Sequence, residues 1–489
     1  MLLTLILLPL MTGVLAFCLR NDRLRRGLLL STALVHAWST GLCWMRTPSP
    51  ALGGWLLLDA PGLLFLSITS ILFLTISFYA LGYLHREEWG RRQDFEEGFL
   101  FTNAREAAFT GCLLLFLAMM TLVTMSQHFG LLWVAVEATT LTSAPLIYFH
   151  RHRRSLEATW KYLLICSVGI ALALLGNFFL AVASTVGRES HVLMTVQSLI
   201  DQAGLLHVTW LKAAFILLLV GYGTKLGLAP MHTWLPDAHS EAPSVISALL
   251  SGALLNCAFL AILRVHQVSV AAGQGEFGRN LLLGFGLLSM IVAAVFILRQ
   301  NDFKRMLAYS SVEHMGILSF AIGLGGVANF GAMLHAVNHS LTKGMLFLVA
   351  GNVLAAYRTK SMTDIRGVLR VLPISGVLWV AGFLAITGSP PFGPFLSELV
   401  ILKSAVDQNR LFVAAAYLLV LGIIFIGMAS SVLGMVQGSS GRDSAGNAPE
   451  SSLSVIPPMA LCAAVLLLGL YVPPALQNVL EGAAKAIAG

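Results

Sequence analysis

Charged side chains are scarce in this sequence. Asp, Glu, Lys and Arg make up 11% of its 489 residues, whereas hydrophobic residues make up 57% and the mean hydropathy is +0.82. This balance excludes an ordinary soluble globular protein, in which about a quarter of the residues are charged. Polar stretches long enough for a soluble domain are also missing, while apolar runs of about 18–25 residues recur along the chain. The composition predicts an all-α polytopic membrane protein.

Cysteine is equally sparse, and no two cysteines have the C-x-x-C spacing of a metal or redox motif. The six residues all lie in apolar runs, where we expect buried small hydrophobic side chains: Cys18, Cys43, Cys112, Cys166, Cys257 and Cys462. A glycine-rich phosphate loop before a helix is missing too. We therefore expect no cofactor, no metal and no catalytic residue in this chain.

The apolar runs predict about 14 transmembrane helices. They cover residues 1–19, 27–45, 61–84, 107–126, 128–149, 159–185, 207–238 (broken), 243–266, 281–298, 306–324, 329–356, 372–405 (broken), 411–437 and 455–472. The first run reaches full membrane length and lacks a basic segment before it, so we interpret it as a span and not as a signal peptide.

The net charge of +7 reflects topology and does not indicate a nucleic-acid partner. If the spans alternate in direction, most arginines and lysines fall in loops on one side of the bilayer: 20–26, 85–106, 150–158, 299–305 and 357–371. The positive-inside rule places these loops in the cytoplasm and both termini outside.

The most informative stretch is a membrane span that carries a lysine and then breaks. Lys225 stands near the centre of an apolar run, and Pro230 follows it, where the missing backbone donor opposes a continuous helix. A charge at this depth costs about 2.5–3.5 kcal/mol on insertion scales, so we expect a functional residue. The alternative is a proline-kinked helix whose lysine reaches the headgroups.

A second broken span suggests an internal repeat. Pro390 interrupts it and Glu398 follows, and an acidic residue lies two spans earlier in each half of the chain. In the sequence, 88 residues separate Glu137 from Lys225, and 85 separate Glu313 from Glu398. Broken helices in corresponding halves are typical of inverted-repeat transporters with sites near the midplane. We predict two inverted five-helix repeats, each containing a broken helix.

These repeats divide the chain into four regions. Residues 1–106 would hold N-terminal helices 1–3, residues 107–266 the first repeat with the proton-uptake half, residues 281–437 the second repeat with the proton-exit half, and residues 455–489 a C-terminal helix and tail.

Ionisable residues inside the spans are candidates for a proton path. The set comprises Glu137, Lys161, Lys225, His335, His339, Lys343 and Glu398, with Glu313, His314 and Lys403 as further candidates. The i, i+4, i+8 spacing of His335, His339 and Lys343 places three titratable groups on one helix face. A hydrogen-bonded polar seam between helices is the structural alternative. A metal site is disfavoured because no further ligand lies nearby in the sequence.

Glu137 and Lys225 are predicted to form a pair near the midplane, on facing helices. At about 4 Å and an effective dielectric constant of 20, opposite charges attract by about 4 kcal/mol. A small change in their separation would therefore couple movement to proton release.

The segment Lys225-Leu-Gly-Leu-Ala-Pro-Met-His-Thr-Trp-Leu-Pro-Asp-Ala-His-Ser-Glu-Ala-Pro243 resembles the signature of the antiporter-like subunits of respiratory complex I, Mrp-type cation/proton antiporters and membrane-bound hydrogenases. The resemblance extends from roughly residue 60 to residue 440. It implies that Glu137 is the glutamate of the fifth core helix, with Lys225 its partner on the broken seventh. It also implies these roles: Lys161 as the accessory lysine, His335, His339 and Lys343 as the central groups, and Glu398 as the exit residue.

Two departures refine the resemblance. Asn256 stands where many complex I homologues have a second lysine, which puts a lysine-to-lysine relay in doubt. The Glu313-His314 pair stands where those relatives usually have a neutral residue before the histidine. Both features are more similar to the hydrogenase-4 component F type, found in formate hydrogenlyase-like complexes.

The resemblance implies a proton-translocating membrane subunit of a redox-driven complex of the hydrogenase-4 or NADH dehydrogenase-like type. In the predicted topology, protons would be taken up near His232, Asp237 and His239, pass His335, His339 and Lys343, and leave past Glu398. Iron–sulfur, nickel–iron or quinone centres are expected only in partner subunits, which would include other membrane subunits and a peripheral redox arm in a bacterial or archaeal cytoplasmic membrane. An Mrp-type antiporter subunit, a quinone-reducing subunit and a structural module with a vestigial channel are the alternatives.

Overall fold

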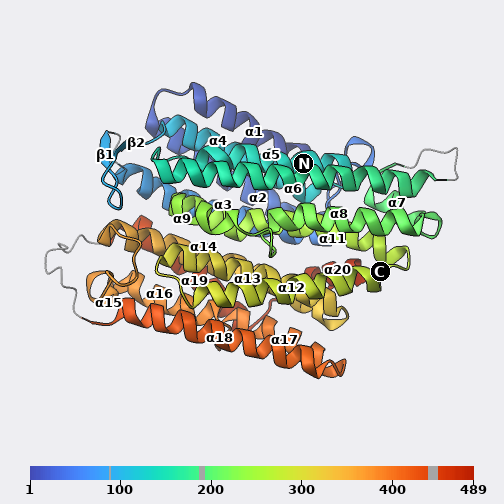
Figure 1. Cartoon of the computed structure of the whole chain (residues 1–489). Coiled ribbons are helices and arrows are strands. Elements are labelled where there is room, and N and C mark those ends of the chain that lie inside the picture. The colour runs from blue at the N-terminus through green and yellow to red at the C-terminus, as the bar shows by residue number, and fades with distance from the viewer. Residues whose placement is uncertain (88–89, 187–192, 439–449, 489) are drawn as a thin grey trace.

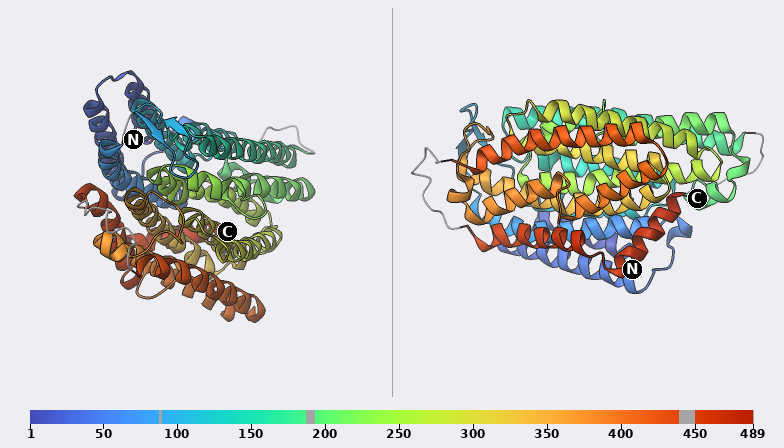
Figure 2. Two further views of the ribbon diagram at one scale, coloured as in Figure 1. Left: turned by 60° about the vertical axis from the view of Figure 1, so that its left-hand side comes forward. Right: turned by 90° about the horizontal axis from the view of Figure 1, so that it is seen from below.

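The computed structural model describes residues 1–87, 90–186, 193–438 and 450–488. Most of them belong to helices that run side by side along one direction, horizontal in Figure 1. The N-terminal half of the chain occupies the upper part of that view, and the C-terminal half the lower part. Two further views show the same elongated bundle (Figure 2).

The helices of the described residues follow one another along the chain in the following order. The α-helices are α1 (Leu2–Cys18), α2 (Asp22–Met45), α3 (Ala60–Arg86), α4 (Glu106–Met125), α5 (Phe129–Ile147), α6 (Arg153–Thr185), α7 (Val196–Asp201), α8 (Val208–Leu226), α9 (Trp234–Glu241), α10 (Ser244–Leu249), α11 (Leu255–Ala271), α12 (Gly275–Ile297), α13 (Phe303–Leu324), α14 (Val327–Tyr357), α15 (Val368–Val371), α16 (Pro373–Ile386), α17 (Gly393–Asp407), α18 (Leu411–Val436), α19 (Ser452–Leu470) and α20 (Pro474–Ala488). Short turns η1 (Leu52–Gly54) and η2 (Ala203–Leu205) are 3-10 helices, and η3 (Leu250–Leu254) is a π-helical turn between α10 and α11.

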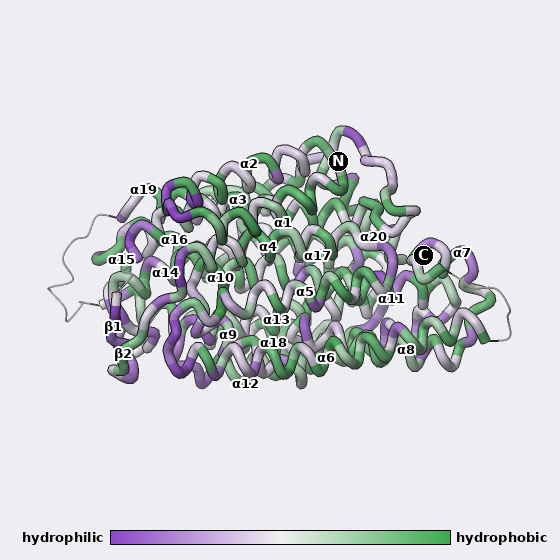
Figure 3. The backbone as a smooth tube through the Cα atoms, turned by 90° about the horizontal axis from the view of Figure 1, so that it is seen from above, coloured by the Kyte–Doolittle hydropathy of each residue, from purple (hydrophilic) through white to green (hydrophobic). Residues whose placement is uncertain are grey.

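Twelve segments among the described residues are long and apolar enough to cross a membrane, with α10, η3 and α11 forming one of them. Helices α1 and α16 are apolar but shorter. Hydrophobic residues dominate the middle of the bundle, and hydrophilic ones gather around β1, β2 and the neighbouring loops (Figure 3). The predicted multi-pass helical membrane protein is therefore confirmed.

Both predicted interruptions are present. Helix α8 ends at Leu226, where Gly227 adopts the left-handed conformation (φ 84°) that closes many helices. The chain resumes as α9 at Trp234. The second interruption separates α16, which ends at Ile386, from α17, which begins at Gly393. Two membrane helices are thus split into halves, as the prolines indicated.

Three features differ from the sequence-based expectation. A two-stranded antiparallel ribbon, β1 (Arg91–Gln93) and β2 (Leu100–Thr102), interrupts the all-α pattern. The expected C-terminal tail is the amphipathic helix α20, which packs against α3, α11 and α14 because Leu480, Ala483 and Ile487 form one apolar face. Cys18 is exposed and not buried, because it ends α1 at the surface, and Cys462 is only partly buried. All six cysteines are free.

The loops predicted to share one side of the membrane do meet at one end of the bundle. Arg26 contacts Glu106 at 2.8 Å, and Arg154 contacts Asp94 at 2.9 Å. A further pair joins Lys360 to Glu241 at 2.9 Å. This end carries β1, β2, α9 and α15 in Figure 1, whereas both chain termini lie toward the opposite end.

The Lys360–Glu241 pair is buried although both groups lie between spans. Burial by itself raises the pKa of the Glu241 carboxyl, but the ammonium group of Lys360 outweighs burial and holds that pKa at about 2. Glu241 therefore stays ionised and ties the end of α9 to the loop after α14.

Labelling tests the side of the membrane on which this end lies. A cysteine introduced at Gly98, the exposed tip of the β1–β2 ribbon, should not react with an impermeant maleimide added to intact cells, because the basic loops are predicted to be cytoplasmic. It should react once the cells are permeabilised. Reaction in intact cells would contradict the predicted topology.

Candidate functional site

Lys225 lies in the last turn of α8 and is fully buried. Its Nζ donates hydrogen bonds to the Oγ1 of Thr140 at 2.8 Å and to the hydroxyl of Tyr162 at 2.5 Å, and it lies 4.4 Å from the centre of the Tyr162 ring. The carboxyl end of a helix carries a partial negative charge that favours a cation. Hydroxyl groups and a helix end therefore hold this lysine, which does not reach the headgroups.

Among the described residues Lys225 and Glu137 share no direct salt bridge, and both side chains contact the hydroxyl of Thr140. Glu137 lies on α5 and is only half-buried, and its Oε2 accepts from the Thr140 hydroxyl at 3.4 Å. Its Oε1 accepts from Ser167 at 3.4 Å. Because Thr140 also accepts from Lys225, one hydroxyl separates the two charges. The Thr140 hydroxyl therefore links the two side chains.

Lys161 also differs from its expected place within the buried set. It points outward from α6, where its side chain is 45% exposed and contacts Glu157 at 2.7 Å and Asp237 at 2.9 Å. The next residue, Tyr162, is the one that turns inward and reaches Lys225. Since α6 is apolar on nearly all sides, the sequence did not distinguish the two faces.

A line of small polar groups lies between the two halves of the bundle. The π-helical turn η3 brings Ser251 within 2.8 Å of Ser311 on α13, measured between hydroxyl oxygens. Asn256 of α11 donates to the Ser340 hydroxyl on α14 at 2.7 Å, while its own Oδ1 has no hydrogen-bond partner among the described residues. The amide thus occupies the place of the missing second lysine and joins α11 to α14.

The predicted ladder on α14 faces α13. His335, His339 and Lys343 are all fully buried. His335 shares a hydrogen bond of 2.8 Å with His314, and the rings of His314 and His339 are 4.9 Å apart. Lys343 donates to the Leu307 carbonyl at 2.6 Å and to the Ser310 hydroxyl. The ladder and the histidine of α13 therefore form one connected cluster.

Glu398 completes this cluster from α17. Its carboxyl group packs against Gly388, where a Cβ atom would overlap the carboxylate, so the break before α17 leaves room for the acid. His335 also contacts the Ser397 hydroxyl at 2.9 Å. Ligating atoms of His314, His335 and Glu398 lie within 4.8 Å of one another, so α17 brings in a third potential metal ligand that the sequence had not placed there. The direct hydrogen bond between the two rings favours proton exchange within this group.

Several polar atoms in the cluster have no hydrogen-bond partner among the described residues. They include Oε2 of Glu313, Oε1 of Glu398 and both ring nitrogens of His339. Buried polar groups are nearly always hydrogen-bonded. Glu313 is nearly inaccessible on α13, as expected for a titratable group inside the membrane.

The predicted uptake residues lie near the end where the basic loops meet, but they differ in exposure. Asp237 forms ion pairs with Lys161 at 2.9 Å and with Arg305 at 2.8 Å. His232 is buried beside Tyr309, with 6.2 Å between the ring centres. His239 is fully buried and stacks on Phe347 at 5.1 Å.

Sequence reasoning missed the hydroxyl side chains that contact the predicted ionisable residues. Thr140, Tyr162, Ser310 and Ser397 all contact a predicted ionisable group. Serine and threonine are common in membrane helices, so their types carried no signal. Lys304 was also missed, because it was assigned to a basic loop.

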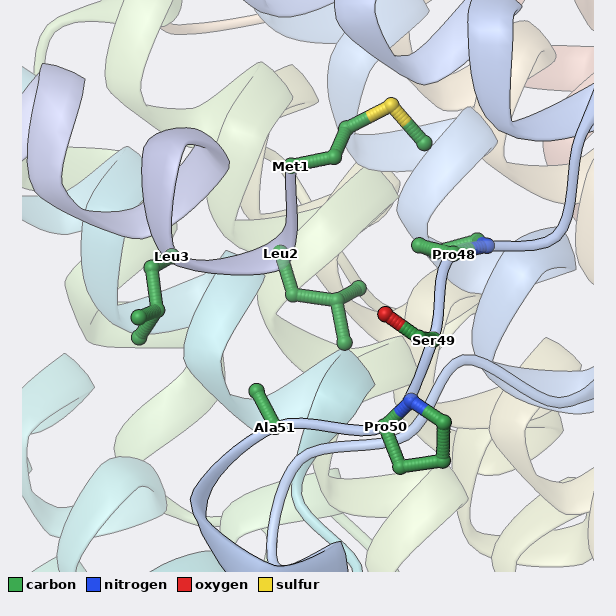
Figure 4. Close-up of a pocket in the computed structure, with 7 residues that line it drawn as sticks. All are labelled: Met1, Leu2, Leu3, Pro48, Ser49, Pro50 and Ala51. Atoms are coloured by element: carbon green, nitrogen blue, oxygen red, sulfur yellow. The ribbon is translucent and has the colours of Figure 1, made fainter.

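A surface hollow near the N-terminus lies apart from this cluster. Figure 4 shows its lining by Met1–Leu3 and Pro48–Ala51, which contribute no ionisable side chain. We therefore assign it no part in the pathway.

A family model described as "NADH:quinone oxidoreductase/Mrp antiporter, TM" matches residues 126–425. The chain belongs to this family. The matched region contains the Lys225 contacts, the α14 ladder and Glu398, so the buried cluster lies inside the family's shared part.

Curated relatives include a hydrogenase-4 component F homologue of Methylacidiphilum infernorum, which is 37% identical over 86% of this chain and 86% of the relative. Hydrogenase-4 component B of Escherichia coli is 30% identical over 70% of this chain, and the match covers 50% of that relative. Na(+)/H(+) antiporter subunit A1 of Staphylococcus epidermidis is 29% identical over 80% of this chain and 51% of the relative.

Solved structures share the fold at low identity. A chain of the archaeal membrane-bound sulfane sulfur reductase covers all of this chain with a TM-score of 0.87 and 20% identity, and 97% of that chain is matched. A chain of the Mrp complex of Dietzia matches with a TM-score of 0.83 and 19% identity, over 100% of this chain and 96% of that chain. A chain of respiratory complex I of Thermus thermophilus matches with a TM-score of 0.76 and 22% identity, over 96% of this chain and 96% of that chain.

Proposed function

We propose that this chain is a proton-translocating membrane subunit of a redox-driven complex of the hydrogenase-4 type. The observation that carries the proposal is the buried cluster in which Lys225, the α14 ladder and Glu398 are surrounded by hydroxyls and imidazoles. Ionisable residues at membrane depth are costly and mark ion or proton pathways. Electron transfer would belong to partner subunits of the complex.

The geometry supports a relay in two halves. In the first, Lys225 exchanges protons with Glu137 through the Thr140 hydroxyl. In the second half, protons pass through side chains of α13, α14 and α17, in the order Lys343, His339, His314, His335 and Glu398. Asn256 does not titrate, so it would orient the Ser340 hydroxyl between the halves and would not carry a proton itself.

The hydrogenase-4 assignment rests on the component F homologue, which is similar over nearly the whole length of both chains. An Mrp-type cation/proton antiporter subunit is the second candidate, supported by the antiporter subunit A1 relatives. The latter match this chain over only about half of their own length.

The proposal includes the finer architecture. Fourteen spans would arise from the twelve longer segments together with α1 and the α16–α17 pair. Residues 107–266 and 281–437 would form inverted repeats, supported by Lys225 in the last turn before one break and Glu398 in the second turn after the other. Both termini would lie outside a bacterial or archaeal cytoplasmic membrane.

Purification in mild detergent tests the assignment. The complex should contain further membrane subunits, a nickel–iron hydrogenase-type large subunit and iron–sulfur proteins, because this chain would need them to drive transport. Recovery with only the small subunits of an Mrp antiporter would contradict the hydrogenase-4 assignment and favour the second candidate.

A further inference from the structure

The first turn of α13 is bound to the end of α9 by a buried lysine that the pathway does not use. Lys304 is 1% exposed. Its Nζ donates to the carbonyl oxygens of Ser240 at 3.0 Å and of Ala242 at 2.5 Å. These carbonyls belong to the carboxyl end of α9, where the partial negative charge of a helix stabilises a cation.

Two neighbours of Lys304 strengthen the same junction. Asp302 caps α13 by accepting from the backbone amides of Lys304 at 2.8 Å and Arg305 at 3.1 Å, and it also accepts from the Ser240 hydroxyl at 2.6 Å. Arg305 forms its ion pair with Asp237 on α9. The two helix ends therefore meet through both side-chain and backbone contacts.

The following turns of α13 contact the proton relay directly. The Leu307 carbonyl and the Ser310 hydroxyl accept from Lys343, and His314 bonds to His335. Helix α9 is the second half of the broken helix whose first half, α8, carries Lys225 in its last turn. A single helix thus connects the broken helix of one half to the lysine of the other half.

We propose that Lys304 is a positioning residue that couples α9 to the Lys343 part of the relay. A displacement of α9 pulls the first turn of α13 and changes the contacts of Lys343 with Leu307 and Ser310. Burying an ammonium group carries a large desolvation cost, so an apolar side chain would serve a passive packing role at lower cost. This inference rests on the proposed proton transport.

The test compares variants of the purified complex reconstituted in vesicles. A potassium diffusion potential drives proton flux, which an enclosed pH dye reports. Lys304→Met keeps the length of the side chain but removes the donors, and we expect it to lower the flux about tenfold. Arg299→Met is the matched control, because Arg299 is an exposed cation at the same end, and it should keep wild-type flux.

The double variant of Lys304 and Lys343 distinguishes a positioning role of Lys304 from a purely structural one. In the Lys343→Ala background, Lys304→Met should cause little additional loss, because the two residues act on one step. Lys304→Arg should restore part of the flux, since a guanidinium also donates to carbonyls. Amide hydrogen exchange of α9 should be faster in Lys304→Met.

The outcomes separate the two proposals. Wild-type flux in Lys225→Ala would contradict the proposed function itself. A loss in Lys225→Ala together with wild-type flux in Lys304→Met would overturn the coupling role alone. If Lys304→Met does not assemble, Lys304→Gln replaces it; failure of both to assemble would show that Lys304 serves folding, which also overturns the coupling role.

Discussion

Replacing Lys225 by alanine is expected to abolish proton translocation in the assembled complex. The ammonium group is the only cation that contacts both Thr140 and Tyr162 among the described residues. Loss of a proton-transfer group typically slows a reaction by about 10²–10⁴-fold, so we expect a flux at least about 100-fold below wild type. Proton uptake by vesicles containing the complex measures the effect.

Two variants serve as controls for Lys225→Ala. Lys212, on the same helix, lies 5.2 Å from the centre of the Phe277 ring and outside the relay, so Lys212→Ala should keep near-normal flux. Asn256→Ala should have a mild effect, because a side chain that never ionises can be replaced by water. Near-normal pumping by Lys225→Ala would contradict the relay.

Replacing Glu398 by glutamine is expected to block proton release while the complex still assembles. The amide keeps the volume and polarity of the carboxyl group beside Gly388 but cannot titrate. His335 and His314 would remain hydrogen-bonded to each other but would lose the carboxyl group of α17 as a partner for proton exchange. We expect a loss of about 100-fold or more in proton flux, measured in the same vesicles.

Lys403 and Asp407 supply the control for Glu398→Gln. Sequence reasoning had kept Lys403 as a possible buried group, but its side chain is 76% exposed and lies 3.8 Å from Asp407 on the same helix. Lys403→Gln and Asp407→Asn should therefore leave the flux unchanged. Wild-type pumping by Glu398→Gln in a fully assembled complex would place the exit elsewhere.

The sequence predicted the features that depend on spacing along one helix. Pro230 and Pro390 indicated where two helices break, and the i, i+4, i+8 spacing indicated that His335 and Lys343 share a face. Lys225 was predicted to be buried because its neighbours on both sides are apolar. These arguments need no knowledge of which helices meet.

The remainder of the site depends on contacts between distant helices. An apolar membrane helix does not reveal which face meets lipid, so Lys161 was expected inside and Tyr162 was overlooked. Lys225 donates to the hydroxyl of Thr140, which in turn donates to Glu137, so Thr140 lies between the two charged groups. Lys304 was assigned to a loop because its partners are backbone carbonyls of a helix more than 60 residues earlier.

Proton flux in sodium-free buffer tests the central claim most directly. Vesicles containing the wild-type complex would be given a potassium diffusion potential, and the internal pH would be followed with and without added sodium. We expect the same flux in both buffers, and its loss in Lys225→Ala. Flux that requires sodium, or no flux above that of empty vesicles, would contradict a proton-conducting path through this chain.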